Sequence, residues 1–127
     1  MEIKLTPQES EQYFYNALCN AVGTNYMDGY GLEMSFFSRD YLAAKEKLKS
    51  PCYEDVLMQI LRDGKKLTFV DNESEGDMTR SITLKDVHER VQLTPIKHLT
   101  DMIEENDDVT TADVILQQVF WNEIVFG

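Results

Sequence analysis

Few residues of this chain are of the types that carry out acid–base or metal chemistry. The sequence contains two histidines, His88 and His98, and His98 stands three residues before Asp101. That spacing places both side chains on one face of a helix, so a small metal-dependent enzyme centred on His98 and Asp101 is one hypothesis. A metal site needs three or four ligands, and the sequence pattern supplies no others. The alternative interpretation is an exposed helical histidine.

The two cysteines do not indicate a redox or zinc site. Cys19 and Cys52 are far apart, no CxxC motif is present, and both lie in apolar helical stretches, where burial raises a thiol pKa. We expect them to be small buried hydrophobic residues. The sequence also has no glycine-rich phosphate loop, GxSxG or HExxH motif. It therefore predicts no set of catalytic residues, no metal site and no cofactor.

The negative charge is concentrated in the second half of the chain. Residues 67–127 carry 4 basic and 13 acidic side chains, which is −9 of the net charge of −11. Two clusters supply the imbalance: Asp71, Glu73, Glu75 and Asp77 in the segment 71–77, and Asp101, Glu104, Glu105, Asp107 and Asp108 in the segment 101–108. Such a charge field can imitate nucleic acid towards a basic partner, or it can simply keep a small domain soluble.

The segment 71–77 superficially resembles a calcium-binding loop, with acidic or amide residues at alternate positions followed by Gly76. The match fails because Ile82 stands where a bidentate glutamate is needed. An exposed, charged hairpin tip is the simpler interpretation.

Eight of the 13 aromatic residues lie within residues 1–41, and the loop 25–31 is the candidate recognition segment of this part of the chain. It contains Tyr26, Asp28 and Tyr30 together with two glycines. Tyrosine offers a large contact area with few rotors to freeze, and glycine allows a partner to approach the backbone closely. The alternative is a turn whose tyrosines fold back onto the first helix.

Local patterns predict the elements that position these residues. Period-two alternation indicates strands at 32–36, 66–71 and 78–83, the last two forming a hairpin. Hydroxyl–proline pairs at Thr6, Ser50 and Thr94 are typical of helix starts, as are Thr83 and Thr110 with an aspartate three residues later. Together with apolar stripes, these signals predict helices at 7–22, 38–49, 51–64 and 84–91. A further helix is predicted from Pro95, with Ile96, Leu99 and Ile103 as its apolar residues. The final helix is predicted to turn Val114, Ile115, Val119 and Phe120 inward. Leu42 is among the apolar positions of the second helix, and the apolar tail 124–127 is expected to pack on the core.

This order lacks the regular alternation of strand and helix that a parallel sheet requires. The sequence therefore predicts an α+β fold: a single compact domain spanning 1–127, with five or six helices packed on a small antiparallel sheet that contains a central hairpin. A length of 127 residues fits one domain.

Composition narrows the classes of function. A sequence pI near 4.5 argues against direct binding of nucleic acid or anionic lipid. No segment is apolar enough to span a membrane, and the N-terminus lacks the features of a signal peptide, so a cytoplasmic location is expected. The first hypothesis is a small acidic, non-enzymatic protein–protein interaction or regulatory module with a protein partner. The alternatives are an acidic nucleic-acid mimic and the metal-dependent enzyme, and the oligomeric state stays open.

Overall fold

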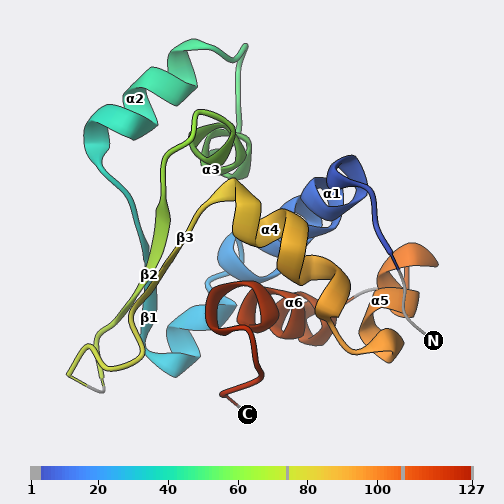
Figure 1. The fold of residues 1–127 in the computed structure, drawn as a ribbon. Helices are drawn as coiled ribbons and strands as arrows, with labels where there is room; N and C mark the ends of the chain where they lie inside the picture. The colour runs from blue at the N-terminus through green and yellow to red at the C-terminus, as the bar shows by residue number, and fades with distance from the viewer. Residues whose placement is uncertain (1–3, 74, 107, 127) are drawn as a thin grey trace.

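The computed structural model describes residues 4–73, 75–106 and 108–126, and these form a helical body beside a small sheet (Figure 1). The α-helices of this part are α1 (Pro7–Ala17), α2 (Ser38–Glu46), α3 (Tyr53–Arg62), α4 (Leu84–Arg90), α5 (Ile96–Ile103) and α6 (Val109–Trp121). Shorter turns are a π-helical segment (Leu18–Val22) that continues α1, and 3₁₀ segments at Tyr26–Tyr30 and Val91–Leu93. The strands are β1 (Leu32–Ser35), β2 (Leu67–Asp71) and β3 (Arg80–Ile82). The predicted α+β class is confirmed.

The sheet is antiparallel with the order β1-β2-β3, so β2 is central and the predicted hairpin of β2 and β3 is present. Met34 pairs with Phe69, and Leu32 pairs with Asp71. Because β1 and β2 are separated in sequence by α2 and α3, their pairing depends on tertiary contacts.

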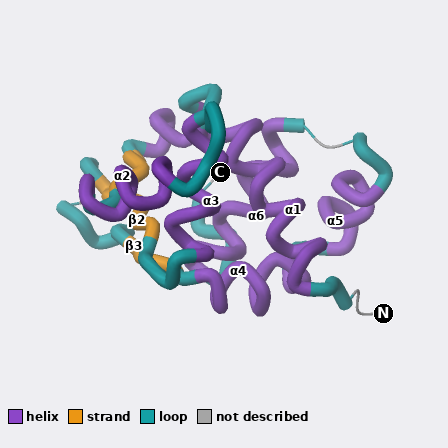
Figure 2. The backbone as a smooth tube through the Cα atoms, turned by 90° about the horizontal axis from the view of Figure 1, so that it is seen from above, coloured by secondary structure: helices purple, strands orange, loops and turns teal. Residues whose placement is uncertain are grey.

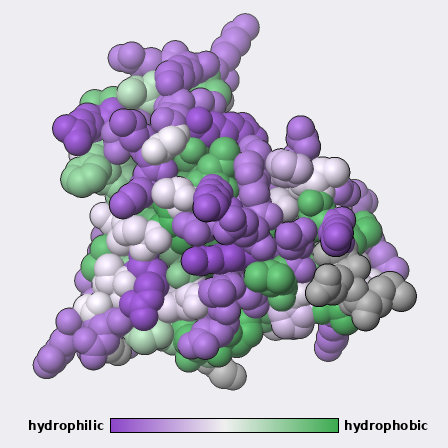
Figure 3. All heavy atoms as spheres, in the orientation of Figure 1, coloured by the Kyte–Doolittle hydropathy of each residue, from purple (hydrophilic) through white to green (hydrophobic). Residues whose placement is uncertain are grey.

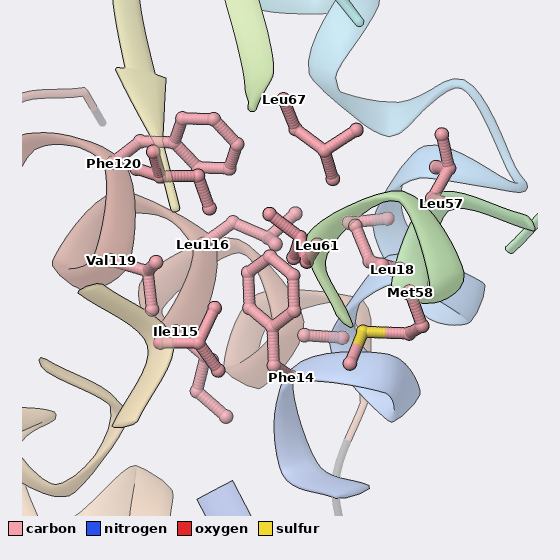
Figure 4. Close-up of a cluster of buried hydrophobic side chains, with 14 of the residues drawn as sticks. Phe14, Leu18, Leu57, Met58, Leu61, Leu67, Ile115, Leu116, Val119 and Phe120 are labelled. Atoms are coloured by element: carbon pink, nitrogen blue, oxygen red, sulfur yellow. The ribbon is translucent and has the colours of Figure 1, made fainter. Parts of the chain in front are cut away.

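The core is built around α6, which lies beside α1 in both views of the backbone (Figure 1, Figure 2). The ring of Phe120 stands 4.4 Å from that of Phe69 and 6.4 Å from that of Phe14, measured between centroids. Leucine and isoleucine side chains from α3 and α6 fill the space around these rings (Figure 4). The core therefore joins the sheet, α1, α3 and α6.

The helix starts agree with the sequence pattern at some positions and differ at others. Thr6 makes the predicted capping box, in which the Glu9 amide donates to Thr6 Oγ1 over 3.1 Å and the Thr6 amide donates to Glu9 Oε1 over 2.9 Å. At the second hydroxyl–proline pair, however, Ser50 has a φ of 48°, and α3 begins two residues later, after Cys52. The cap predicted from Thr110 is wrong, because Asp108 accepts the Thr111 amide over 3.0 Å.

Several apolar side chains that the helical stripes placed inward are exposed. Leu42 is 59% exposed, Ile96 51% and Ile103 45%. The expectation of two buried cysteines is also wrong, since Cys52 is exposed and Cys19 is half-buried. The prediction that the tail packs on the core is confirmed at Phe126, whose ring stacks on that of Tyr30 with centroids 4.8 Å apart. It is wrong at Ile124, which is 45% exposed, and Gly127 lies outside the described residues.

Within the described residues, every helix is too short or too polar to cross a bilayer.

Candidate functional site

An open cleft of about 520 Å³ lies between the segment 18–31, strand β1 and the start of α3. Its lining residues are Ala21, Val22, Asn25, Met27, Asp28, Gly31, Leu32, Glu33, Met34, Tyr53, Phe69 and Asn72. Ala21, Met27, Leu32 and Phe69 belong to the buried core, so the floor of the cleft is apolar. We call this hollow the β1 cleft.

The chain turns into the β1 cleft at Gly31, which requires glycine. Gly31 has a φ of 75°, and the side chain of Glu73 occupies the space that a Cβ atom would need. Any other residue would strain the backbone and displace Glu73. The close approach of these two segments sets the position at which β1 begins.

The β1 cleft follows the outer edge of β1. Residues 31–34 all line it, so the hollow runs along the length of β1. The Asn72 amide donates to the Gly31 carbonyl over 2.9 Å, which makes this a hydrogen-bonded pair. Because such pairs alternate along an antiparallel ladder, Glu33 and Ser35 also face β2, whereas the backbone groups of Leu32 and Met34 point away from it.

The charged lining of the β1 cleft is acidic. Asp28 and Glu33 line it, and none of its described lining residues is lysine, arginine or histidine. Glu33 Oε2 accepts one hydrogen bond, from Asn72 Nδ2 over 3.2 Å. The pKa of Tyr53, on the opposite wall, is raised by burial and then by the neighbouring Tyr41, Glu54 and Glu33. The cleft therefore disfavours anions and favours cationic groups.

An aromatic rim borders the β1 cleft on the side of α2. The rings of Phe36 and Tyr41 stack at 5.0 Å between centroids, and Tyr53 lies 6.2 Å from each. Next to them Phe37 is 67% exposed, and Figure 3 shows apolar surface beside the start of α2. We call Phe36, Phe37, Tyr41 and Tyr53 the aromatic rim.

The predicted recognition loop contributes only in part to this site. Asp28 lines the β1 cleft, and Tyr26 is 38% exposed. Tyr30 points inward instead: its hydroxyl donates to Asp113 Oδ2 over 2.6 Å, and its ring stacks on Phe126. Tyr30 thus folds back onto the structure, but onto α6 and the C-terminal tail rather than onto the first helix.

The two acidic clusters lie at opposite ends of the molecule (Figure 1, Figure 2). At the hairpin tip Asp71 is buried and accepts the backbone amides of Glu73 and Met78, over 2.9 and 3.1 Å, so this carboxylate closes the turn. In the second cluster Glu104 and Glu105 are exposed and Asp101 is half-buried, while Asp108 caps α6. Asp107 lies outside the described residues.

The residues considered for catalysis do not converge. His98 Nδ1, on α5, lies 3.5 Å from Thr111 Oγ1 on α6. His88 Nε2, on α4, lies 2.9 Å from Glu11 Oε2 on α1. Among the described residues, no three or more His, Cys, Asp or Glu side chains are grouped closely enough to hold a metal ion. The structure therefore supplies no further ligands for His98 and Asp101 in that part of the chain.

A second hollow, of about 350 Å³, lies between α1 and α3, but its carboxylates already have partners. Glu11 accepts from Arg62 Nε over 2.9 Å, and Asp55 accepts from the Tyr15 hydroxyl over 2.7 Å. The carboxylates of the β1 cleft have weaker hydrogen-bond partners than those of the second hollow, which favours the β1 cleft as the binding site.

Comparison of the chain with protein-family models, curated proteins and solved structures gave no match.

Sequence reasoning missed Glu33, Met34 and Tyr53 as residues of the site. Their juxtaposition depends on the pairing of β1 with β2 and on the packing of α3, neither of which leaves a local pattern. The one usable signal was the isolated strand pattern at 32–36, since a strand without a neighbouring partner in sequence often lies at a sheet edge.

Proposed function

We propose that this chain is a non-enzymatic protein–protein interaction module that binds its partner at the β1 cleft and the aromatic rim. The observation that carries the proposal is the cleft itself, a hollow with an apolar floor, two acidic side chains and exposed aromatic residues at its border. Recognition sites in proteins combine these same features.

The energetics of the site support binding. Aromatic side chains bury a large apolar area and have few rotatable bonds to restrict on binding. Two of them already contact neighbouring groups: the Arg39 guanidinium lies 5.3 Å from the Phe37 ring centroid, and the ring of Tyr53 packs beside that of Phe36. A partner that covers this surface removes exposed apolar area from water at about 25 cal/mol per Å². Prior ordering of the rings reduces the entropy cost of binding.

The test is a quantitative affinity capture from host extract with two matched charge-reversal variants. Glu33→Arg places a bulky cation in the β1 cleft, whereas Glu104→Arg makes the same change of charge at the turn between α5 and α6. Both sites are exposed, so circular dichroism should show that both variants fold. We expect a protein that the wild type and Glu104→Arg capture equally and Glu33→Arg loses. If no captured protein depends on Glu33, the proposed function is wrong.

The nucleic-acid mimic stays as the second candidate because Glu104 and Glu105 are exposed side by side at one end of the molecule. It makes the opposite prediction for the same pair of variants. A mimic would lose a DNA- or RNA-binding partner with Glu104→Arg and retain it with Glu33→Arg.

A further inference from the structure

The outer edge of β1 has unused backbone hydrogen-bonding groups. The amides and carbonyls of Leu32 and Met34 point away from β2, and within the described residues no hydrogen bond engages them. Their side chains are nevertheless buried or half-buried, so the strand is held firmly in place. An edge of this kind can accept a further strand through its main chain.

The β1 cleft leaves room for the side chains of such a strand. It extends along residues 31–34 and has a volume of about 520 Å³, which exceeds that of any single side chain. Leu32 and Met34 lie on the face with the apolar floor, whereas Glu33 lies on the opposite face. An added strand would therefore present alternate residues to an apolar surface and to carboxylates.

The charge of the cleft specifies the added residue. Asp28 and Glu33 are exposed carboxylates, and no basic side chain lines the cleft in the described part of the chain. Lysine and arginine carry the cationic heads that pair with such carboxylates. Tyr53 adds an aromatic surface that favours cations.

We propose that the β1 cleft binds an extended segment of a partner protein, which adds as a fourth strand to the free edge of β1 and places a lysine or arginine side chain against Asp28 and Glu33. This inference rests on the proposed function and specifies its partner. A second copy of this chain is a poorer occupant, because pairing of two β1 strands brings together four carboxylates on two molecules of net charge −11 each.

The experiment is selection of a random linear heptapeptide library on the purified full chain, with Asp28→Asn/Glu33→Gln as the matched counter-target. We expect enriched peptides to share a basic residue at one fixed position. Replacement of that residue by glutamine should weaken binding about fivefold, which corresponds to an exposed ion pair of about 1 kcal/mol. The control variant Glu104→Gln/Glu105→Gln changes charge by the same amount elsewhere and should bind as the wild type does.

Strand addition has its own readout in amide hydrogen exchange. The bound peptide should slow exchange at the Leu32 and Met34 amides, and a peptide N-methylated on its pairing edge should lose binding. The inference is overturned if no peptide is enriched, if the enriched peptides lack a basic residue, or if Leu32 and Met34 stay unprotected. Protection of these amides in the free protein by dimer formation would overturn it as well. The capture experiment with Glu33→Arg judges the proposed function independently, since a folded partner could bind the cleft without adding a strand.

Discussion

Removal of one hydroxyl, in the variant Tyr30→Phe, should destabilise the fold measurably. The Tyr30 hydroxyl donates to Asp113 Oδ2 over 2.6 Å, and Asp113 is 6% exposed. Its other oxygen accepts from Gln117 Nε2 over 2.8 Å. Phenylalanine keeps the ring that stacks on Phe126, so the variant removes only the hydroxyl, which hydrogen-bonds to the buried Asp113 and also interacts with Tyr26.

The magnitude follows from the kind of hydrogen bond. A hydrogen bond to a charged group contributes about 1.5–3 kcal/mol, and a buried acceptor left with one donor fewer places the loss within that range. For a chain of this length, 1 kcal/mol shifts Tm by about 4 °C, so we expect Tm to fall by about 6–12 °C. The C-terminal tail should loosen as well, because Gln117 Oε1 accepts the amides of Val125 and Phe126, each over 2.8 Å.

The assay is thermal and urea unfolding followed by circular dichroism, with Tyr41→Phe as the matched control. Tyr41 packs through its ring, and its hydroxyl has no hydrogen bond within the described residues. The control should therefore stay within about 0.5 kcal/mol of the wild type. A Tyr30→Phe variant as stable as Tyr41→Phe would refute the reasoning.

The same contact predicts a response to alkaline pH. Burial and the hydrogen bond to Asp113 raise the pKa of Tyr30 above its ordinary value of 10.0. A pKa raised by folding contributes stability that is complete below about pH 10 and is lost as the pH rises towards the folded-state pKa. Above pH 10 the stability of the wild type should therefore fall more steeply than that of Tyr30→Phe, and parallel curves would contradict the prediction.

Two further predictions concern Glu11 and the two cysteines. Burial opposes ionisation of Glu11, but hydrogen bonds and charge from Arg62 and His88 lower its pKa below 4.5. Its contribution to stability is present above about pH 4.5 and is lost as the pH falls through the lowered pKa, so Glu11→Gln should reduce Tm at pH 7 and have little effect at pH 2. Exposed Cys52 should be alkylated by iodoacetamide faster than half-buried Cys19, whose pKa is raised by burial, and equal rates by mass spectrometry would count against the structure.

Local chemistry explains which parts of the fold could be predicted. The capping box at Thr6 and the hairpin of β2 and β3 depend on residues close in sequence, and both were found. The helix start predicted at Ser50 was wrong because a serine before proline can also adopt a left-handed conformation, as its φ of 48° shows. For Ile96 and Ile103 the reason is different: α5 packs against α6 and buries Leu99 and Met102, whereas Ile96 and Ile103 stay exposed.

Of the residues that line the candidate site, the sequence predicted only Asp28 as a binding residue. Asp28 was chosen for its place in a glycine-rich aromatic loop, and it lines the β1 cleft. Glu33 and Tyr53 were not predicted as site residues, because nothing local shows that β1 lies at a sheet edge beside the start of α3. Tyr30 was chosen for the right residue type, but its hydroxyl found a buried partner 83 residues away.

The distribution of charge decides which experiment can separate the two binding hypotheses. The acidic clusters at the two ends and the carboxylates of the β1 cleft all belong to a molecule of net charge −11, so a basic partner is attracted to the whole surface. Added salt screens that attraction wherever the partner docks, with a Debye length of about 10 Å at 0.1 M. Loss of affinity with salt would therefore follow from a mimic and from a cleft-bound basic strand alike. Reversal of one charge at Glu33 or at Glu104 acts over a shorter range and changes the two docking sites differently, so that comparison, and not the salt dependence, distinguishes them.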